Sequence, residues 1–274
     1  MAHARLGALV VVILAGGGPA AAGTSVPLES FMAGLWTVRV ELPDGGPRWR
    51  FLVDTGSTHT VVSPAAAHAA GVTVTPGTVL LTPGGLVAAG EADLPPFRLG
   101  GRLQPGLRVR VVPLADVGGD SRLDGILGMD ALGGWPMVLD VAGARLEFGE
   151  GAPGGAGDGI PVPARVQDGR VVVEVRVDGV RRTMVLDSGA SMPVVFDATA
   201  SGAPAAIGTA GGRQSARAAR AELRVGDVVL GGVATLQVPP PQGRTGSDGL
   251  LPVALFSRVF IDPARGEVRV VPRR

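Results

Sequence analysis

Two short segments of the chain each hold an aspartate in a setting suited to acid–base chemistry. Residues 51–63 read FLVDTGSTHTVVS, and residues 184–196 read MVLDSGASMPVVF. In both, an apolar run leads into the aspartate, and a hydroxyl residue and a glycine follow it. Asp187 lies 133 positions after Asp54. A strand that ends in this way delivers a carboxyl group to a tight turn, and two copies related by a pseudo-twofold axis could bring two carboxyls together.

Two carboxyl groups a few ångströms apart cannot both ionise at moderate pH, so they share one proton. The ionised group can take a proton from a bridging water, and the protonated group can donate to the oxygen of an amide carbonyl. The chemistry that this pair offers is therefore hydrolysis by general acid–base catalysis. It needs no covalent intermediate, no metal and no cofactor.

The paired segments resemble the active-site turns of aspartic proteases of the pepsin and retroviral type. The matching residues are Leu52-Val53-Asp54-Thr55-Gly56-Ser57 and Val185-Leu186-Asp187-Ser188-Gly189-Ala190. One Asp-Thr-Gly alone would say little, because that tripeptide is common in β-turns. The resemblance implies that Asp54 and Asp187 are catalytic and that the rest of each turn supports them. The supporting residues are Thr55, Gly56, Ser57, Ser188, Gly189 and Ala190.

The resemblance also assigns roles within each turn. The hydroxyls of Thr55 and Ser188 are expected to reach across to the backbone of the other lobe, and each glycine allows close packing with N–H groups directed at the carboxylates. The turns differ at Ser57 and Ala190. In the family a Ser or Thr here donates a hydrogen bond to its own aspartate, and such a bond favours the charged form. Asp54 is therefore predicted to be the more acidic partner, and Asp187 to carry the shared proton.

The elements around the two aspartates also repeat. Residues 36–42 alternate apolar and charged side chains, which predicts a half-buried strand, and residues 48–53 return as the second arm of a hairpin. Residues 171–177 and 181–186 repeat this hairpin around Asp178-Gly179. Residues 24–34 read as an irregular lead-in. Each aspartate is followed by an Asp-Gly-apolar element and a closing hairpin, at residues 124–132 with 137–148 and at residues 248–256 with 259–271.

Together with the resemblance, this order implies an all-β protein of two similar retropepsin-like closed β-barrel lobes, related by a pseudo-twofold axis, with short helices. We expect a first lobe at residues 24–150, a Gly-rich linker at 151–160 and a second lobe at 161–274. The whole chain would then be a monomeric pseudo-dimer. One short helix is predicted after the first turn, with Ser63 as N-cap, Pro64 at its first position and Gly71 at its end. Pro252 stands where the first copy has Gly128, so this turn should differ between the lobes.

Two Gly-tipped hairpins follow the aspartates at comparable distances, at residues 80–91 and 206–217. In retroviral proteases each subunit closes over substrate with a flap of this kind. The resemblance makes Gly84 and Gly85, and Gly211 and Gly212, the candidate flap tips. The alternative is a pair of surface hairpins that do not touch ligand.

The N-terminus has the pattern of a secretory signal. Arg5 precedes an apolar core at residues 6–15, and Ala20-Ala21-Ala22 offers a small-residue cleavage site. A signal peptide at residues 1–22 predicts an exported, periplasmic or secreted protein with no stable membrane insertion after cleavage. An uncleaved anchor is the alternative, but the apolar core is short for a bilayer. The absence of cysteine means that disulfides cannot stabilise the exported chain.

The composition excludes several other functions. The net charge is only +1, the arginines are scattered, and aromatic residues make up 4% of the chain, so nothing indicates a nucleic-acid partner. His3 lies in the signal, and with only His59 and His68 left and no cysteine, the sequence disfavours a zinc site or a Ser-His-Asp triad. We therefore predict an aspartic endopeptidase that acts on peptide or protein. The alternative is a non-catalytic protease-fold module that binds peptides or envelope proteins.

Overall fold

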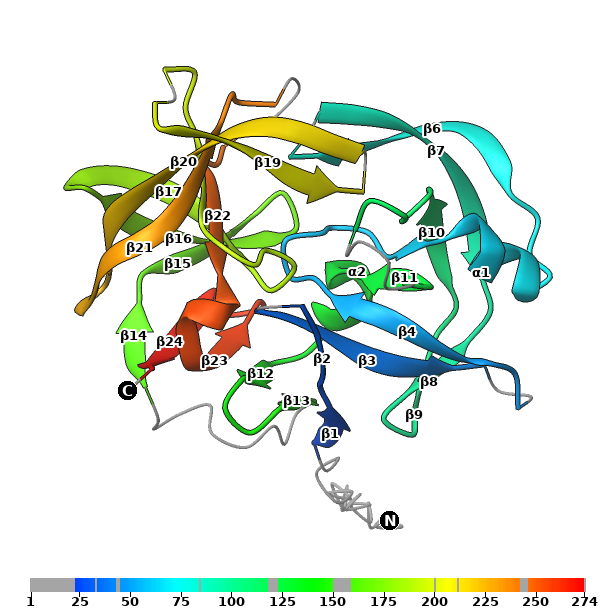
Figure 1. Cartoon of the computed structure of the whole chain (residues 1–274). Coiled ribbons are helices and arrows are strands. Elements are labelled where there is room, and N and C mark those ends of the chain that lie inside the picture. The colour runs from blue at the N-terminus through cyan, green and yellow to red at the C-terminus, as the bar shows by residue number, and fades with distance from the viewer. Residues whose placement is uncertain are drawn as a thin grey trace, which may run out of the picture.

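The computed structural model describes residues 23–32, 34–42, 45–83, 85–117, 123–149, 159–199, 201–210, 212–241 and 246–273. The predicted signal segment, most of the predicted linker, and the candidate tips Gly84 and Gly211 lie outside these residues. The fold is all-β, as the sequence predicts, and two curled lobes lie side by side above a joining sheet (Figure 1). In the described part of the chain, no helix is both long enough and apolar enough to span a membrane.

The first lobe is a ten-stranded sheet in the order β6-β7-β10-β5-β11-β4-β3-β8-β9, and β2 pairs with β3. Its strands are β2 (Glu29–Met32), β3 (Leu35–Glu41), β4 (Arg48–Val53), β5 (Val61–Val62), β6 (Thr75–Thr82), β7 (Gly85–Leu94), β8 (Phe97–Leu99), β9 (Arg102–Gln104), β10 (Leu107–Val111) and β11 (Gly125–Leu127). Two short helices accompany them, α1 (Pro64–Ala69) and α2 (Met129–Leu132).

The second lobe repeats this plan in eight strands, in the order β15-β16-β17-β22-β18-β21-β20-β19. A further pairing of β16 with β20 closes most of this sheet on itself. Its strands are β15 (Ala164–Gln167), β16 (Arg170–Val177), β17 (Val180–Asp187), β18 (Val194–Phe196), β19 (Ala203–Thr209), β20 (Gly212–Val225), β21 (Val228–Val238) and β22 (Gly249–Pro252). A 3₁₀ turn, η1 (Val253–Leu255), follows β22.

A six-stranded sheet of order β1-β13-β12-β23-β24-β14 joins the lobes. Its strands are β1 (Thr24–Pro27), β12 (Met137–Asp140), β13 (Arg145–Phe148), β14 (Ile160–Val162), β23 (Phe256–Asp262) and β24 (Glu267–Pro272). The two closing hairpins predicted from the sequence meet here, because β12 pairs antiparallel with β23 and places Met137 opposite Ile261. Both residues are fully buried. One continuous apolar core therefore runs from lobe to lobe through this sheet.

The predicted irregular lead-in at residues 24–34 is wrong, because most of it is strand. β1 pairs with β13, where Val26 lies opposite Leu146 and is buried in the core. β2 pairs with β3 through a bulge between Ser30 and Met32. Both strands are short, and they form because β13 and β3 offer them pairing partners, which their own sequence does not indicate.

The helix predicted after the first aspartate is confirmed. The Ser63 hydroxyl accepts the N–H of Ala66 at 3.1 Å, and Pro64 begins the helix. Gly71 follows the C-terminus with φ +66°, a left-handed conformation that glycine adopts at little cost. This helix carries the chain from β5 towards hairpin β6–β7.

Candidate active site

Both candidate aspartates stand at the ends of strands that a second strand supports. Asp54 follows β4, and Asp187 is the last residue of β17. β11 runs parallel to β4 and β22 runs parallel to β17. The N–H of Asp54 donates to the carbonyl of Leu127 at 3.1 Å, so the strand beneath the turn fixes its position.

A second pair of aspartates anchors these strands. The carboxylate of Asp124 accepts the backbone N–H of Arg50 at 3.0 Å, and that of Asp248 accepts the N–H of Thr183 at 2.8 Å. Arg50 and Thr183 each lie four residues before a candidate aspartate. The repeat seen in the sequence therefore extends to the individual hydrogen bonds that position the two turns.

Four buried hydrogen bonds connect one turn to the other. The Thr55 hydroxyl donates to the carbonyl of Leu186 at 2.8 Å and accepts the N–H of Ser188 at 3.0 Å. The Ser188 hydroxyl donates to the carbonyl of Val53 at 2.7 Å and accepts the N–H of Thr55 at 3.0 Å. Both hydroxyl residues are buried. The structure thus places these hydroxyls where the resemblance implies, across the boundary between the lobes.

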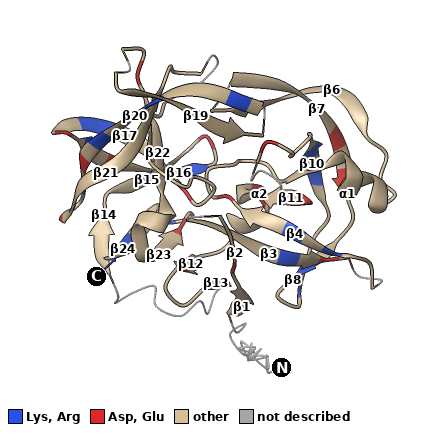
Figure 2. Ribbon diagram, viewed as in Figure 1, with Lys and Arg blue, Asp and Glu red and all other residues tan. Residues whose placement is uncertain are grey.

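Each carboxyl group packs against the glycine of the opposite turn. A Cβ added to Gly56 would lie 2.5 Å from Cγ of Asp187, and a Cβ added to Gly189 would lie 2.5 Å from Cγ of Asp54. Any larger residue at either glycine would occupy the space of a carboxyl. The two carboxyls are joined by a hydrogen bond. Acidic segments accordingly lie in the middle of the molecule, where the lobes meet (Figure 2).

The environment separates the acidities of the two groups. Burial raises the pKa of Asp187 well above its ordinary value, and the nearby charge of Asp54 raises it further. Burial also raises the pKa of Asp54, but the hydrogen bond from Asp187 and the N–H groups of Gly56 and Ser57, at 2.9 and 3.0 Å from Oδ1, oppose this. These causes favour the shared proton on Asp187 and the negative charge on Asp54.

The predicted direction of this asymmetry agrees with these pKa shifts, but its predicted cause is wrong. The Ser57 hydroxyl donates to the carbonyl of His59 at 2.8 Å instead of to Asp54. Backbone N–H groups take its place at the Asp54 carboxylate. A short hydroxyl side chain can bond to a backbone acceptor two residues on, which competes with the Asp54 carboxylate.

The floors of the two turns differ, as Pro252 predicts. In the first lobe the carboxylate of Asp130 accepts the N–H of Thr60 at 2.9 Å and its hydroxyl at 2.6 Å, and the N–H of Gly128 donates to that hydroxyl at 3.2 Å. The second lobe lacks this arrangement. Its residues at the three equivalent positions are Pro193, Ala254 and Pro252. Because neither proline has an N–H to satisfy, a carboxylate is not needed there. Sequence reasoning missed this role of Asp130, although Thr60, Asp130 and Gly128 are all replaced together in the second copy, which indicates that the three residues act as a unit.

Beside each turn lies an apolar wall that is separate from the main core. On β4, β5 and β11 alternate residues belong to the core, and their neighbours face the other way towards hairpin β6–β7. The first wall includes Leu52, Val61 and Ile126, with Leu80 and Ala89 from the hairpin. The corresponding wall of the second lobe includes Val194, Phe196 and Leu250, with Ile207 and Ala216 from hairpin β19–β20. Apolar surface therefore lies between the aspartate-bearing strands and the hairpin in each lobe.

The hairpins β6–β7 and β19–β20 lie along the top of the molecule in Figure 1, above the strands that carry the aspartates. Their ends are built alike, since the Thr82 hydroxyl donates to the carbonyl of Gly85 at 3.0 Å and the Thr209 hydroxyl to that of Gly212 at 3.1 Å. These are the hairpins in which the sequence places the candidate flap tips.

The two hairpins differ in what they touch. A Cβ added to Gly208 would lie 2.6 Å from the carbonyl oxygen of Asp116, so β19 lies directly on a loop of the first lobe. Ala210, near the end of the same hairpin, packs on the first apolar wall. The equivalent of Gly208 in the other hairpin is Leu81, whose side chain is exposed. The second hairpin thus rests on the opposite lobe, whereas the first presents apolar residues to solvent.

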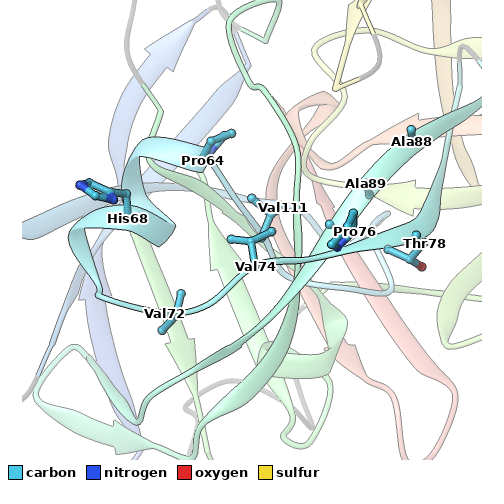
Figure 3. Close-up of a pocket in the computed structure, with 11 residues that line it drawn as sticks. Pro64, His68, Val72, Val74, Pro76, Thr78, Ala88, Ala89 and Val111 are labelled. Carbon is cyan, nitrogen blue, oxygen red and sulfur yellow. The ribbon is translucent and has the colours of Figure 1, made fainter.

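A hollow of about 680 Å³ lies away from the aspartates, on the outer side of the first lobe between α1 and the base of hairpin β6–β7 (Figure 3). Apolar side chains such as Val74 and Val111 line it, and His68 lies at its edge. His68 is exposed, as expected for a solvated helix residue. Among the described residues that line this hollow, His68 is the one titratable group.

Comparison with known families agrees with this geometry. Residues 36–131 match a family described as aspartyl protease. This match supports an aspartyl protease of the retropepsin type in this part of the chain. The match covers the first turn, the strand beneath it and Asp130, and it ends before the second lobe. A comparison with curated proteins gave no match.

Proposed function

We propose that this protein is an aspartic endopeptidase in which Asp54 and Asp187 together activate a water molecule. One observation carries the proposal. Two carboxyls from different lobes are in hydrogen-bond contact, and each packs against the glycine of the opposite turn. This arrangement buries two acids and raises their pKa values, which costs stability, and ionisable groups perturbed in this way cluster at functional sites.

The protonation states give each carboxyl a role. Asp54, ionised and held by two backbone N–H groups, takes a proton from water as the water oxygen bonds to the peptide carbonyl carbon. Asp187 donates its proton to the carbonyl oxygen, and a tetrahedral diol forms. When the C–N bond breaks, Asp54 gives its proton to the leaving nitrogen and a diol hydroxyl returns one to Asp187. Both carboxyls then have their starting protonation states.

The surroundings favour a peptide with apolar side chains close to the scissile bond. The apolar walls of the two lobes flank the aspartates on both sides. The exposed side chains of Val79, Leu81 and Leu86 on hairpin β6–β7 can add apolar contacts as that hairpin meets a bound chain. Burial of such side chains is worth roughly 1.5 to 3 kcal/mol each, enough to select among peptides.

Digestion of a peptide library between about pH 3 and pH 8, in water enriched in ¹⁸O, tests the proposal. Mass spectrometry should find new C-termini that carry ¹⁸O, with apolar residues enriched around the cleavage sites. The double variant Asp54→Asn/Asp187→Asn controls for contaminating proteases. Peptides that bind the wild-type protein without being cleaved at any pH would support the binding-module alternative and contradict the proposal.

A further inference from the structure

Hairpin β15–β16 of the second lobe brings a basic residue to the first aspartate turn. Its two-residue turn, Asp168-Gly169, has positive φ at both positions, and Arg170 begins β16 directly after it. A Cβ added to Gly169 would lie 3.5 Å from Cγ2 of Thr58, four residues after Asp54 in the opposite turn. Arg170 therefore stands next to a contact between the lobes, on the Asp54 side of the site.

Within the described part of the chain, the side chain of Arg170 has no partner of its own. Its Nε is buried and makes no hydrogen bond. The Nε atoms of Arg110 and Arg182 are in the same state, but their guanidinium groups pair with Glu91 and Asp197. Among the described residues, none forms an ion pair or a side-chain hydrogen bond with Arg170. A guanidinium has five N–H donors and no acceptor, so a partly buried one without a carboxylate partner retains unused donors.

The cation has no counterpart in the first lobe. Leu52 and Val185 each lie two residues before a candidate aspartate, and they pair with Thr37 on β3 and Val172 on β16. Thr37 and Val172 are therefore equivalent, and two residues earlier Leu35 is equivalent to Arg170. Leu35 is buried in the apolar wall. Arg170 thus replaces an apolar residue by a charge on one side of the site only. Figure 2 shows a basic segment close to the β16 label, near the middle of the molecule.

The positive charge of Arg170 acts on Asp54 without forming an ion pair with it among the described contacts. Arg170 lowers the pKa of Asp54, yet no ion pair within 4 Å joins them among the described contacts. Asp54 is already held by Asp187 and by the N–H groups of Gly56 and Ser57. The guanidinium is therefore available to a further acceptor, and a carboxylate fits best because it can accept two parallel N–H bonds.

We propose that Arg170 is a specificity-determining residue that binds the carboxylate of an acidic substrate side chain close to the scissile bond. The inference rests on the proposed peptidase function. The site would then combine two apolar walls with one cationic position on the Asp54 side. Substrates would carry an aspartate or glutamate at a single defined position among apolar residues.

Matched peptides test this role. A peptide cleaved by the wild-type protein is made in pairs with Glu or Gln at each position around the cleavage site, and kcat/KM is measured for each pair. One position should favour Glu over Gln by about tenfold or more, the scale of one charge-assisted hydrogen bond. Arg170→Met should bring the ratio close to unity, and Arg170→Lys should retain part of it. Arg176→Met, an exposed arginine on the same strand, should leave the ratio unchanged.

The ratio separates specificity from a general effect on catalysis. Loss of Arg170 should also raise the pKa of Asp54. Both peptides of a pair meet the same Asp54 and Asp187, so this change cancels in the ratio of their kcat/KM values. A Glu preference that survives in Arg170→Met, no preference at any position, or an equal loss for both peptides would overturn the inference. If the Met variant does not fold, the Lys variant gives the ratio. Absence of any cleavage by the wild-type protein would instead overturn the proposed function, and this inference with it.

Discussion

The hydrogen bonds that cross between the two turns lead to a quantitative prediction for Thr55→Val. Valine keeps the shape of threonine but removes a fully buried hydroxyl that bonds to Leu186 and to Ser188. The N–H of Ser188 then has no acceptor, which costs about 1 to 3 kcal/mol, and the lost bond to the Leu186 carbonyl adds about 1 kcal/mol. The variant should lose about 2 to 4 kcal/mol of unfolding free energy.

Urea unfolding measures this loss, with tryptophan fluorescence and circular dichroism followed together to check for a single transition. Ser188→Ala removes the mirror-related pair of bonds and should cost a similar amount. Thr73→Val, at an exposed threonine, is the matched control and should change stability by less than about 0.5 kcal/mol. A loss below about 1 kcal/mol in Thr55→Val would refute the reasoning that these bonds hold the turns together.

Three further predictions concern acidity and the second hairpin. Because folding raises the pKa of Asp187, the unfolding free energy of the wild-type protein should fall as pH rises above about 4, and Asp187→Asn should show much less of this fall. Urea midpoints that change with pH by the same amount in both proteins would contradict this. Ser57→Ala should keep the acidic limb of the kcat/KM profile in place, since that hydroxyl bonds to His59, and a shift of about one pH unit would contradict this. Gly208→Ala should lower kcat/KM several-fold by pushing β19 off Asp116, whereas Gly231→Ala, with open space around its Cβ, should not; equal values would remove any role for that contact.

Much of the fold could be predicted from the sequence because the chain contains the same plan twice. The alternation in residues 36–42 and the return at 48–53 match β3 and β4 closely. The Asp-Gly-apolar elements lie under the turns as β11 and β22. Hydrophobic period and turn chemistry are local properties, so they can be identified without knowledge of the partner strand.

Features that depend on distant partners could not be predicted in the same way. β1 forms because β13, more than a hundred residues later, offers it an edge. The Ser57 hydroxyl donates to the nearby carbonyl of His59, and the family pattern gives no sign of this acceptor. Arg170 follows Gly169, which approaches the Asp54 turn from the other lobe, and only a comparison of the two copies, with Leu35 at the equivalent position, could have singled it out.

The most direct test of the proposed mechanism is the rate at which one defined peptide is cleaved by Asp54→Asn and by Asp187→Asn. Asparagine fills nearly the same space but can neither ionise nor transfer the proton. If the two carboxyls act as one unit, each single variant should lose at least about a hundredfold in kcat while retaining a cooperative unfolding transition. A folded variant of either kind that keeps kcat within about tenfold of wild type would remove that aspartate from the reaction and contradict the shared-proton mechanism.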